Sequence, residues 1–256
     1  MKRRRLSAAI ITRDEEANIE RCLGALGFVD EIVVVDSGST DRTLEICERY
    51  NCRIVRAEWA GYGKNKQLAV DSASNDWVIS VDADEEVTPE LAAEIEEALS
   101  QDSVRSGYRI KWLSCYLGKW IRHSGWNRQY KLKLFNRTKG GFTDDLLHET
   151  VKLTGETGRL KNVLKHYTYP DLETVIRKGH TYAEMAAAEM YSGGKRSSIL
   201  NAYLHATWAY VKTLIFNLGF LDGWVGHALA TNTAYAVFLK YMKLWERGRR
   251  DDRRKP

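Results

Sequence analysis

The first hundred residues alternate short apolar runs with stretches of helical spacing. The apolar runs end at polar clusters, as buried strands of a parallel sheet do. They occupy residues 6–12, 31–36, 52–55 and 77–81. Helical spacing marks residues 15–26, 39–50 (with Ser39 or Thr40 as the expected cap) and 64–73, and a further helix opens at Thr88-Pro89. Strands that alternate with helices predict an α/β fold with a mostly parallel, Rossmann-like sheet.

The pattern changes twice further along the chain. Residues 108–112 and 131–135 alternate polar and apolar side chains, which predicts half-buried strands and a mixed or antiparallel extension of the sheet. From residue 172 onward the spacing is helical, and a break at 217–223 separates two helices, the second over 224–245. The first of these has a broad apolar face in an aromatic-rich region. That face comprises Leu200, Leu204, Val211, Leu214 and Leu218, with Trp208 and Ile215 beside it.

Composition narrows the class of protein. A hydrophobic fraction of 44% and a charged fraction of 29% over 256 residues are globular values and exclude wholesale disorder. The longest uncharged run, residues 223–239, is partly polar and shorter than the ~20 apolar residues of a membrane span. We therefore expect no transmembrane helix. Four cysteines without zinc-site spacing predict reduced thiols in the cytoplasm.

The net charge of +5 is concentrated at the two ends of the chain. Residues 2–5 are all basic, and residues 247–256 carry six basic against two acidic side chains, which leaves the body mildly acidic. A nucleic-acid-binding protein would carry basic residues across its body, so no nucleic acid partner is expected. Basic ends with aromatic, amphipathic helices favour an anionic membrane surface as a partner. The alternative is solvated ends, with helices that pack on the sheet or on a second subunit.

Carboxylates cluster where the predicted strands end. Asp36 closes the second strand, and Asp82 and Asp84 follow the fourth, at the edge where parallel α/β sheets bind ligands. So much negative charge requires a cation, and hard oxygen ligands suit Mg²⁺ or Mn²⁺. The chain has neither a GxGxxG motif nor a P-loop, so a metal and side chains would have to neutralise a pyrophosphate. This combination indicates an enzyme that uses a nucleotide sugar.

Four motifs in the first third of the chain resemble those of the family 2 glycosyltransferases, which have the GT-A fold. They are IITRDEE at 10–16, EIVVVDSGSTDRT at 31–43, GYGKNKQLA at 61–69 and DWVISVDADE at 76–85. Later segments at 134–137, 147–150 and 216–223 resemble the branch that contains lipopolysaccharide core glucosyltransferases. The resemblance implies metal-dependent, inverting transfer of a sugar from a UDP-sugar to a glycan or glycolipid acceptor. Glucose is the expected sugar. The QxxRW motif of processive synthases is missing, which favours transfer of a single sugar.

The resemblance also implies a division of the chain. The GT-A domain is expected over residues 1–170, with a donor half at 1–100 and an acceptor half at 101–170. A region of amphipathic helices at 171–246 and a basic tail at 247–256 follow. An enzyme with a membrane-anchored acceptor would work in the cytoplasm, as a peripheral protein on the inner face of the plasma membrane.

Family roles carry over to the first motif position by position. Thr12, Arg13 and Glu15 match the strand end that contacts the nucleoside of the donor. Asp14 stands where the family usually has Asn, so the resemblance assigns it no role.

The later motifs supply the remaining donor and metal ligands. Asp36 matches the carboxylate that binds uracil or ribose, Asp82 the position nearer the ribose, and Asp84 the metal ligand. Lys66 falls in the segment that approaches the donor, where it would contact phosphate. His166 is a second candidate metal ligand, because some GT-A enzymes recruit a late histidine, although a structural role is the alternative.

The resemblance places the catalytic base after the sheet extension. Direct displacement needs a carboxylate that takes the proton from the acceptor hydroxyl. The candidates are Asp144, Asp145, His148 and Glu149. Glu149 is the first choice and Asp145 the second, whereas His148 is expected on the acceptor side; a solvated acidic turn is the alternative.

Two further residues complete the expected site. Trp126 and Arg128 form the expected acceptor platform, because aromatic faces stack on sugars and Arg pairs with phosphate. Other interpretations stay open. The acceptor could be a lipid-linked phosphate or a protein, and a catalytically dead membrane-surface binding module is a further alternative. A nucleotidyltransferase is disfavoured, because it usually carries a Gly-rich, Lys-containing loop after the first strand.

Overall fold

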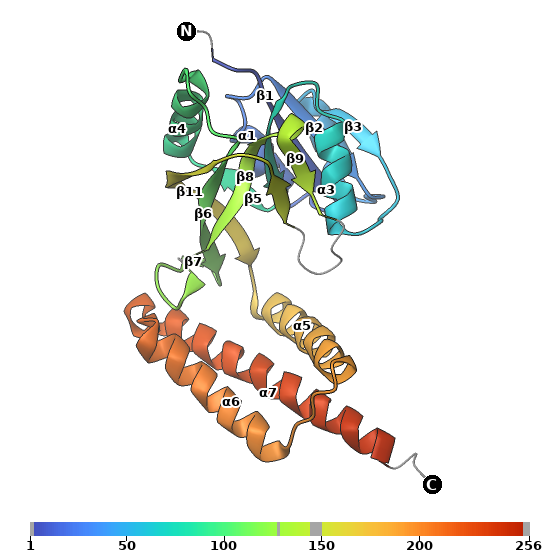
Figure 1. Cartoon of the computed structure of the whole chain (residues 1–256), viewed down its shortest axis with the longest axis vertical. Helices are drawn as coiled ribbons and strands as arrows, with labels where there is room; N and C mark the ends of the chain where they lie inside the picture. Colours follow the sequence, from blue (N-terminus) through green and yellow to red (C-terminus); the bar gives the residue numbers. More distant parts are fainter. Residues whose placement is uncertain (1–2, 127–128, 144–149, 253–256) are drawn as a thin grey trace. The chain divides into compact units, whose positions relative to one another are not determined.

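The computed structural model describes residues 3–126, 129–143 and 150–252. The chain forms two compact units. The first comprises Met1–Trp112 and Arg128–His166, and the second comprises Leu113–Asn127 and Tyr167–Pro256. Most of the sheet belongs to the first unit and the long C-terminal helices to the second (Figure 1).

A parallel half-sheet opens the first unit. Strands β1 (Leu6–Thr12), β2 (Glu31–Asp36), β3 (Arg53–Arg56) and β4 (Trp77–Asp82) lie in the order β3-β2-β1-β4 and pair in parallel. Helices α1 (Ile19–Gly24), α2 (Thr43–Arg49) and α3 (Tyr62–Asp71) connect them, and α4 (Pro89–Ser100) follows. Thr88 caps α4 as predicted, because its hydroxyl accepts a hydrogen bond from the Leu91 N–H at 3.2 Å.

An antiparallel extension continues the sheet beyond β4. Strands β8 (Tyr130–Asn136), β6 (Gly107–Tyr116), β11 (Thr157–Tyr169) and β5 (Glu85–Val87) follow in this order, and β7 (Lys119–Trp120) pairs with β6. Strand β8 is antiparallel to β4 and β6, and β5 is antiparallel to β11. Strands β9 (Gly140–Phe142) and β10 (Val151–Leu153) form a separate antiparallel pair. The predicted α/β class with a mixed extension is therefore confirmed.

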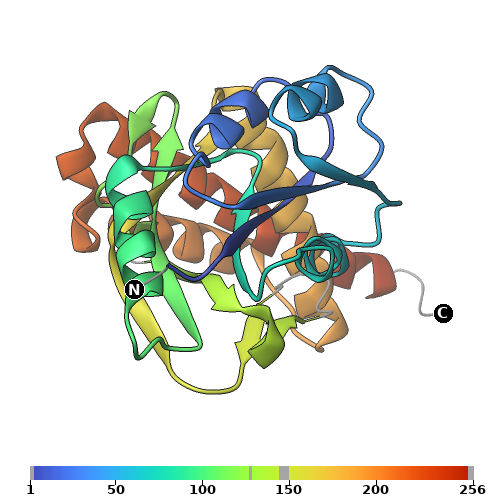
Figure 2. The ribbon, with the colours of Figure 1, turned by 90° about the horizontal axis from the view of Figure 1, so that it is seen from above.

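Both faces of the parallel half-sheet are covered, which explains its nearly continuous apolar strands. Alternate side chains of β1 point to opposite faces. Ala8 and Ile10 join a cluster with side chains from α1, α2 and α4, whereas Ala9 joins another with Ala69 and Val70 of α3. In Figure 2, α3 lies across these strands from α1 and α2. The strand ends are thus supported by packed helices on both sides.

Three helices make up most of the second unit. Helices α5 (Leu172–Ser192), α6 (Ile199–Val211) and α7 (Trp224–Asp252) are accompanied by a π-helical turn η3 (Lys212–Phe216) and a 3₁₀ turn η4 (Gly219–Asp222) between α6 and α7. Helix α7 packs against both α5 and α6, so it is the central helix of the three (Figure 1). Among the described residues, no helix combines the length and the apolar character needed to cross a bilayer.

The break predicted between the last two helices is present. Leu218 has a φ of 57° and Gly223 a φ of 67°, in the left-handed region that interrupts a helix. The Asp222 carboxylate accepts hydrogen bonds from the N–H groups of Arg122 and His123 and from the Ser124 hydroxyl, at 2.8–3.2 Å. The helix after the break is longer than the predicted 224–245, because it continues to Asp252.

Gly226, in the first turn of α7, permits a close backbone contact. A Cβ atom there would lie 1.8 Å from the carbonyl oxygen of Gly219 and 2.7 Å from its carbonyl carbon. We expect Gly226→Ala to lower the free energy of unfolding by about 3 kcal/mol, because the backbone must shift to accept the methyl group. Urea unfolding of the full chain measures this loss.

Gly248→Ala is the matched control on the same helix. The nearest atom to a Cβ at this position is Cδ of the long Arg196 side chain, at 3.4 Å, so Gly248→Ala should be neutral or slightly stabilising. An equal loss in both variants would show that the contact with Gly219 does not set the stability of this turn.

Candidate active site

The polar strand ends meet at one edge of the sheet. In the strand registers, Thr12 of β1 pairs with Asp36 of β2, and Ile11 pairs with Asp82 of β4. Thr12, Asp36 and Asp82 therefore lie side by side at the carboxyl ends of parallel strands. Ligands of α/β sheets bind at such an edge, which makes it the candidate active site.

Asp36 is buried and shapes the turn after β2. Its carboxylate accepts hydrogen bonds from the N–H groups of Gly38 at 3.0 Å and Ser39 at 3.1 Å, and from the Ser39 hydroxyl. Gly38 has a φ of 87°, which glycine adopts at little steric cost. The adjacent Thr12 is also buried, and its hydroxyl has no hydrogen-bond partner among the described residues. A polar ligand at this edge would satisfy that hydroxyl.

The loops after β1 and β2 are tied to each other. Asp14 has a φ of 52°, and its carboxylate accepts hydrogen bonds from the Thr40 N–H at 2.7 Å and the Thr40 hydroxyl at 3.1 Å. The Asp14 N–H donates to the Ser39 hydroxyl at 3.0 Å. The prediction that Ser39 or Thr40 caps the second helix is therefore wrong, because both side chains serve these loops. Helix α2 instead begins at Thr43, after Arg42.

Asn would fit position 14 as well as Asp does. Asn also adopts the left-handed φ and offers an amide oxygen to Thr40. We expect Asp14→Asn to change the free energy of unfolding by less than about 0.5 kcal/mol and Asp14→Ala to lower it by about 1–3 kcal/mol. Guanidinium unfolding of both variants tests this. A loss in the Asn variant as large as in the Ala variant would mean that the negative charge is required.

Arg13 and Glu15 flank Asp14 in different surroundings. The Arg13 side chain is 60% exposed, with Nε 3.9 Å from an Asp14 carboxylate oxygen. The Glu15 carboxylate accepts a hydrogen bond from the Asn18 amide at 2.8 Å, and the Glu15 N–H donates to the Thr43 hydroxyl at 2.8 Å. Glu15 therefore organises the start of α1, and the nucleoside contacts expected of Arg13 and Glu15 stay predictions.

A network of buried charges adjoins the edge. Nζ of Lys66 on α3 lies 2.9 Å from Oδ1 of Asp82, and Nζ of Lys133 on β8 lies 2.9 Å from Oδ2. Lys133 Nζ is also 2.7 Å from Oε2 of Glu85, a fully buried residue whose carboxylate accepts the Asp82 N–H at 2.8 Å. Two of the expected donor ligands, Lys66 and Asp82, thus bind each other, and the cation that Asp82 requires is supplied by lysine.

Burial and pairing act against each other in this network. Burial by itself would raise the pKa of Asp82, but Lys133 and Lys66 outweigh it and hold that pKa below its ordinary value. Burial would lower the pKa of Lys133, but Asp82 and Glu85 raise it. Burial raises the pKa of Glu85 despite the charge of Lys133. Asp82 and Lys133 therefore form a permanently charged pair at neutral pH.

Removal of one member would leave buried charge uncompensated. We expect Lys133→Met to lower the free energy of unfolding by about 3–5 kcal/mol. Lys131→Met is the control, because Lys131 lies on the same strand but is exposed, with its ammonium group over the Trp112 ring, 5.3 Å from the centroid. The control should lose at most about 1 kcal/mol. Equal stability of the two variants in guanidinium unfolding would show that charge pairing does not hold this region.

Asp84 and His166, the two expected metal ligands, lie together. Nε2 of His166 is 3.2 Å from Oδ2 of Asp84, and His166 of β11 pairs in register with Glu85 of β5. The Trp112 ring packs on the imidazole, with 4.6 Å between ring centroids. Burial would lower the pKa of His166, but the hydrogen bond to Asp84 and its charge raise it. A carboxylate oxygen and an imidazole nitrogen this close together can reach one divalent cation.

Comparison with known proteins identifies the family. The family model described as "Glycosyl transferase family 2" matches residues 7–151, which is more than half of the chain. The chain belongs to glycosyltransferase family 2. The resemblance carried by the four motifs is therefore confirmed, and the protein is a glycosyltransferase.

The glycosyltransferase has relatives that match over most of its length. An uncharacterized glycosyltransferase of Rickettsia bellii (strain RML369-C) is 31% identical over 95% of this chain and 87% of that protein. The lipopolysaccharide core biosynthesis glycosyltransferase LpsC of Rhizobium meliloti (strain 1021) is 27% identical over 94% of this chain and 92% of that protein. The match to the crystal structure of S. aureus TarS 1-349 covers 96% of this chain and 92% of that chain at 16% identity, with a TM-score of 0.44.

Several expected residues of the glycosyltransferase lie outside the described residues. They are the four candidates for the base, Asp144, Asp145, His148 and Glu149, and the expected acceptor residue Arg128. The family model spans all of them. Their roles stay predictions.

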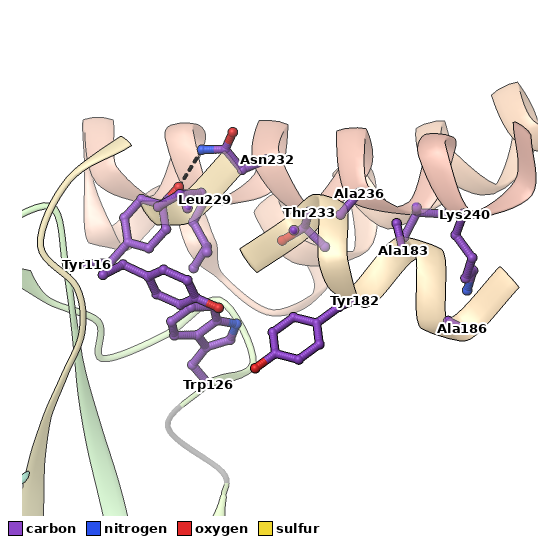
Figure 3. A pocket seen from close by; sticks show the side chains of 14 residues that line it. Tyr116, Trp126, Tyr182, Ala183, Ala186, Leu229, Asn232, Thr233, Ala236 and Lys240 are labelled. Atoms are coloured by element: carbon purple, nitrogen blue, oxygen red, sulfur yellow. Dashed lines mark hydrogen bonds between the residues drawn. The ribbon is translucent and has the colours of Figure 1, made fainter. Parts of the chain in front are cut away.

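Trp126, the other expected acceptor residue, lines a cavity in the second unit (Figure 3). The cavity has a volume of about 320 Å³ and is lined mainly by α5 and α7. Tyr116, Trp126 and Tyr169 form an aromatic end, with ring centroids 5.7–5.9 Å apart. The Asn232 amide donates to the Tyr116 hydroxyl at this end, and Lys240 lies at the other (Figure 3). Aromatic walls with a few polar groups are typical of ligand pockets.

Sequence reasoning missed three polar residues that build the active-site edge: Lys133, Glu85 and Asn65. The buried Asn65 amide donates to the Ser37 hydroxyl at 3.0 Å and accepts from the Ala60 N–H at 2.9 Å, which fixes the start of α3 beside the edge. A signal existed for Lys133, because two-residue alternation places it on the same strand face as Phe135. The sequence offers no such signal for Glu85 or Asn65.

Proposed function

We propose that this glycosyltransferase transfers a single sugar, glucose, from a UDP-sugar to a lipopolysaccharide-core-type or other membrane-anchored glycan, with inversion at the anomeric carbon. The observation that carries the proposal is the convergence of Thr12, Asp36 and Asp82 at one sheet edge, with Asp84 of the turn between β4 and β5 paired to His166 of β11. Uracil and ribose offer donors to carboxylates, and the diphosphate requires a cation.

The nucleoside would bind at the ends of β1 and β2. The Asp36 carboxylate already accepts turn hydrogen bonds, but a carboxylate has about four lone-pair sites, so it can also accept from uracil or ribose. The buried Thr12 hydroxyl would gain its partner from the same nucleoside. Arg13 and Glu15 would contact the nucleoside from the loop after β1, Asp82 would lie nearer the ribose, and Lys66 would face phosphate from α3. These roles come from the family motifs.

Asp84 and His166 fit a divalent cation, Mg²⁺ or Mn²⁺. Lys66 and Lys133 already neutralise Asp82, which leaves the Asp84–His166 pair as the side chains that would hold the ion. Groups of three or more His, Cys, Asp or Glu arranged for a metal are absent from residues 3–126, 129–143 and 150–252. Water and phosphate oxygens would then complete the coordination, as is usual for Mg²⁺. When bound, the cation stabilises the departing nucleoside diphosphate.

The base and the acceptor side rest on fewer observations. We keep Glu149 as the residue that takes the proton from the acceptor hydroxyl, with Asp145 second, because displacement needs a carboxylate there. Trp126, together with Arg128 and His148, would bind the acceptor, and the aromatic end of the cavity supports a sugar-stacking role for Trp126.

The relative named as a lipopolysaccharide core biosynthesis glycosyltransferase supports a glycolipid acceptor. Such an acceptor would require a peripheral enzyme at an anionic membrane surface on the cytoplasmic side. A lipid-linked phosphate or a protein is the alternative acceptor. A catalytically dead binding module is disfavoured, because it has no use for Thr12, Asp36 and the Asp84–His166 pair at one edge.

Calorimetric titration with UDP tests the donor site. We expect the full chain to bind UDP more tightly with Mn²⁺ than without it. Asp84→Ala should weaken binding in Mn²⁺ by about tenfold or more, because the cation loses a charged ligand, and should leave metal-free binding nearly unchanged.

Glu97→Ala is the matched control, because Glu97 is an exposed carboxylate on α4, away from the strand ends. It should bind UDP like the unaltered protein with and without Mn²⁺. Absence of UDP binding under every metal condition would refute the UDP-sugar proposal, and ADP, GDP and dTDP would then be titrated. UDP binding without transfer to any glycan acceptor would favour the binding module.

A further inference from the structure

Helix α6 has its large apolar side chains on the outside. Ala202 is buried and Ala206 and Ala209 are half-buried, so small residues face the packed side of the helix. Leu200, Leu204 and Trp208 expose 67%, 60% and 55% of their surface. These three residues repeat every fourth position and therefore share one face. Helix α7 packs on α6 and meets Tyr203 and His205 through the rings of Phe238 and Tyr241, and this packing leaves Leu200, Leu204 and Trp208 exposed.

The exposed apolar surface continues past the end of α6. Phe216 of η3, Phe220 of η4 and Trp224 at the start of α7 expose 62%, 46% and 61% of their surface. Asp222, which accepts the Arg122 and His123 N–H groups, holds the turn in place. The Trp208 and Phe216 rings join the two parts, with 5.4 Å between their centroids. We call these six exposed side chains the α6–η4 face: Leu200, Leu204, Trp208, Phe216, Phe220 and Trp224. An exposed apolar surface of this extent marks an interaction site.

The charged side chains of residues 190–221 all have one sign, and the adjacent carboxylate of Asp222 is engaged by the N–H groups of Arg122 and His123 and by the Ser124 hydroxyl. Residues 190–221 contain no Asp or Glu, and their charged side chains are Lys195, Arg196 and Lys212, all exposed. Helix α6 itself carries no charged residue. A two-fold contact between copies of this segment would bring basic side chains together without acidic partners in the segment. Apolar and aromatic side chains bordered by Lys and Arg instead complement an anionic lipid surface.

We propose that the α6–η4 face inserts into the headgroup and upper acyl region of an anionic lipid leaflet. The axis of α6 then lies in the plane of the interface, Trp208 and Trp224 reach the acyl boundary, and Lys195, Arg196 and Lys212 contact lipid phosphates. The inference rests on the proposed function only to explain why the enzyme would bind a membrane. The surface itself follows from the exposed apolar side chains of residues 200–224 and from the basic side chains Lys195, Arg196 and Lys212.

Flotation of the full chain with lipid vesicles tests the proposal. We expect binding to phosphatidylglycerol–phosphatidylcholine vesicles and much weaker binding to phosphatidylcholine alone. Leu204→Glu/Trp208→Glu should lower partitioning by at least about tenfold, because it places two carboxylates on the inserted face. Ile176→Glu/Met185→Glu is the matched control, since both residues are exposed apolar side chains on α5. The control should bind like the unaltered chain.

Quenching by brominated lipids gives a second readout that does not depend on disruptive charges. Bromine on the upper acyl chain should quench tryptophan fluorescence of bound protein. Trp208→Phe and Trp224→Phe should each bind vesicles normally and each lower the quenched fraction, because Phe keeps the apolar contact and removes the fluorophore.

Two controls separate this inference from the proposed function. UDP titration should give the same affinity for the unaltered chain and for Leu204→Glu/Trp208→Glu, because the variant leaves the strand ends intact. Vesicle binding without UDP binding would support the surface and refute the donor site. UDP binding without vesicle binding, equal partitioning of both double variants, or a dimer in light scattering that dissociates on Leu204→Glu/Trp208→Glu would overturn the membrane surface.

Discussion

The active-site edge depends on two lysines that compensate buried carboxylates where the parallel and antiparallel halves of the sheet meet. Asp82 ends β4, Lys133 comes from β8, Glu85 opens β5 and Lys66 comes from α3, so one network joins four elements. Buried charges tolerate little misplacement, because each must keep its partner within contact distance. Asp84, between two members of this network, is therefore held in a defined position. Its pairing with His166 follows from the antiparallel register of β5 and β11.

Side-chain hydrogen bonds also order the loops at the ends of β1 and β2 on the same edge. Asp36 holds the turn after β2, and Asp14 ties the loop after β1 to Thr40 in that turn. Both loops are thus ordered by carboxylates that bind backbone N–H groups, independently of any ligand. A site arranged before the ligand arrives loses less conformational entropy on binding. The motifs DSGSTD and TRDEE therefore specify the geometry of these two loops.

The sequence predicts the architecture well where burial sets the pattern. Hydrophobic periodicity predicts the four parallel strands and their helices, and a glycine-containing interruption of helical spacing predicts the break at 217–223. Strands β5 and β11 escape prediction, because three residues are too few for a period and β11 is mostly half-buried. At the edge, sequence reasoning places the carboxylates but misses Lys133, because its position on the same strand face as Phe135 is a weak signal for burying a lysine. The burial of Lys133 depends on tertiary contacts, because its ammonium group pairs with the carboxylates of Asp82 and Glu85.

The close contact of Gly226 with the carbonyl group of Gly219 constrains the backbone of the turn after α6 but not its exposed side chains. The main chain of this turn has no room for a Cβ atom at Gly226, whereas the side chains of Phe216, Phe220 and Trp224 are exposed. Replacement of these aromatic residues in descendants of this protein would therefore leave the shape of the turn unchanged. Adaptation of the exposed surface to a different environment would proceed by side-chain replacement alone. Gly219 and Gly226 would be retained, because their close contact fixes the backbone of the turn.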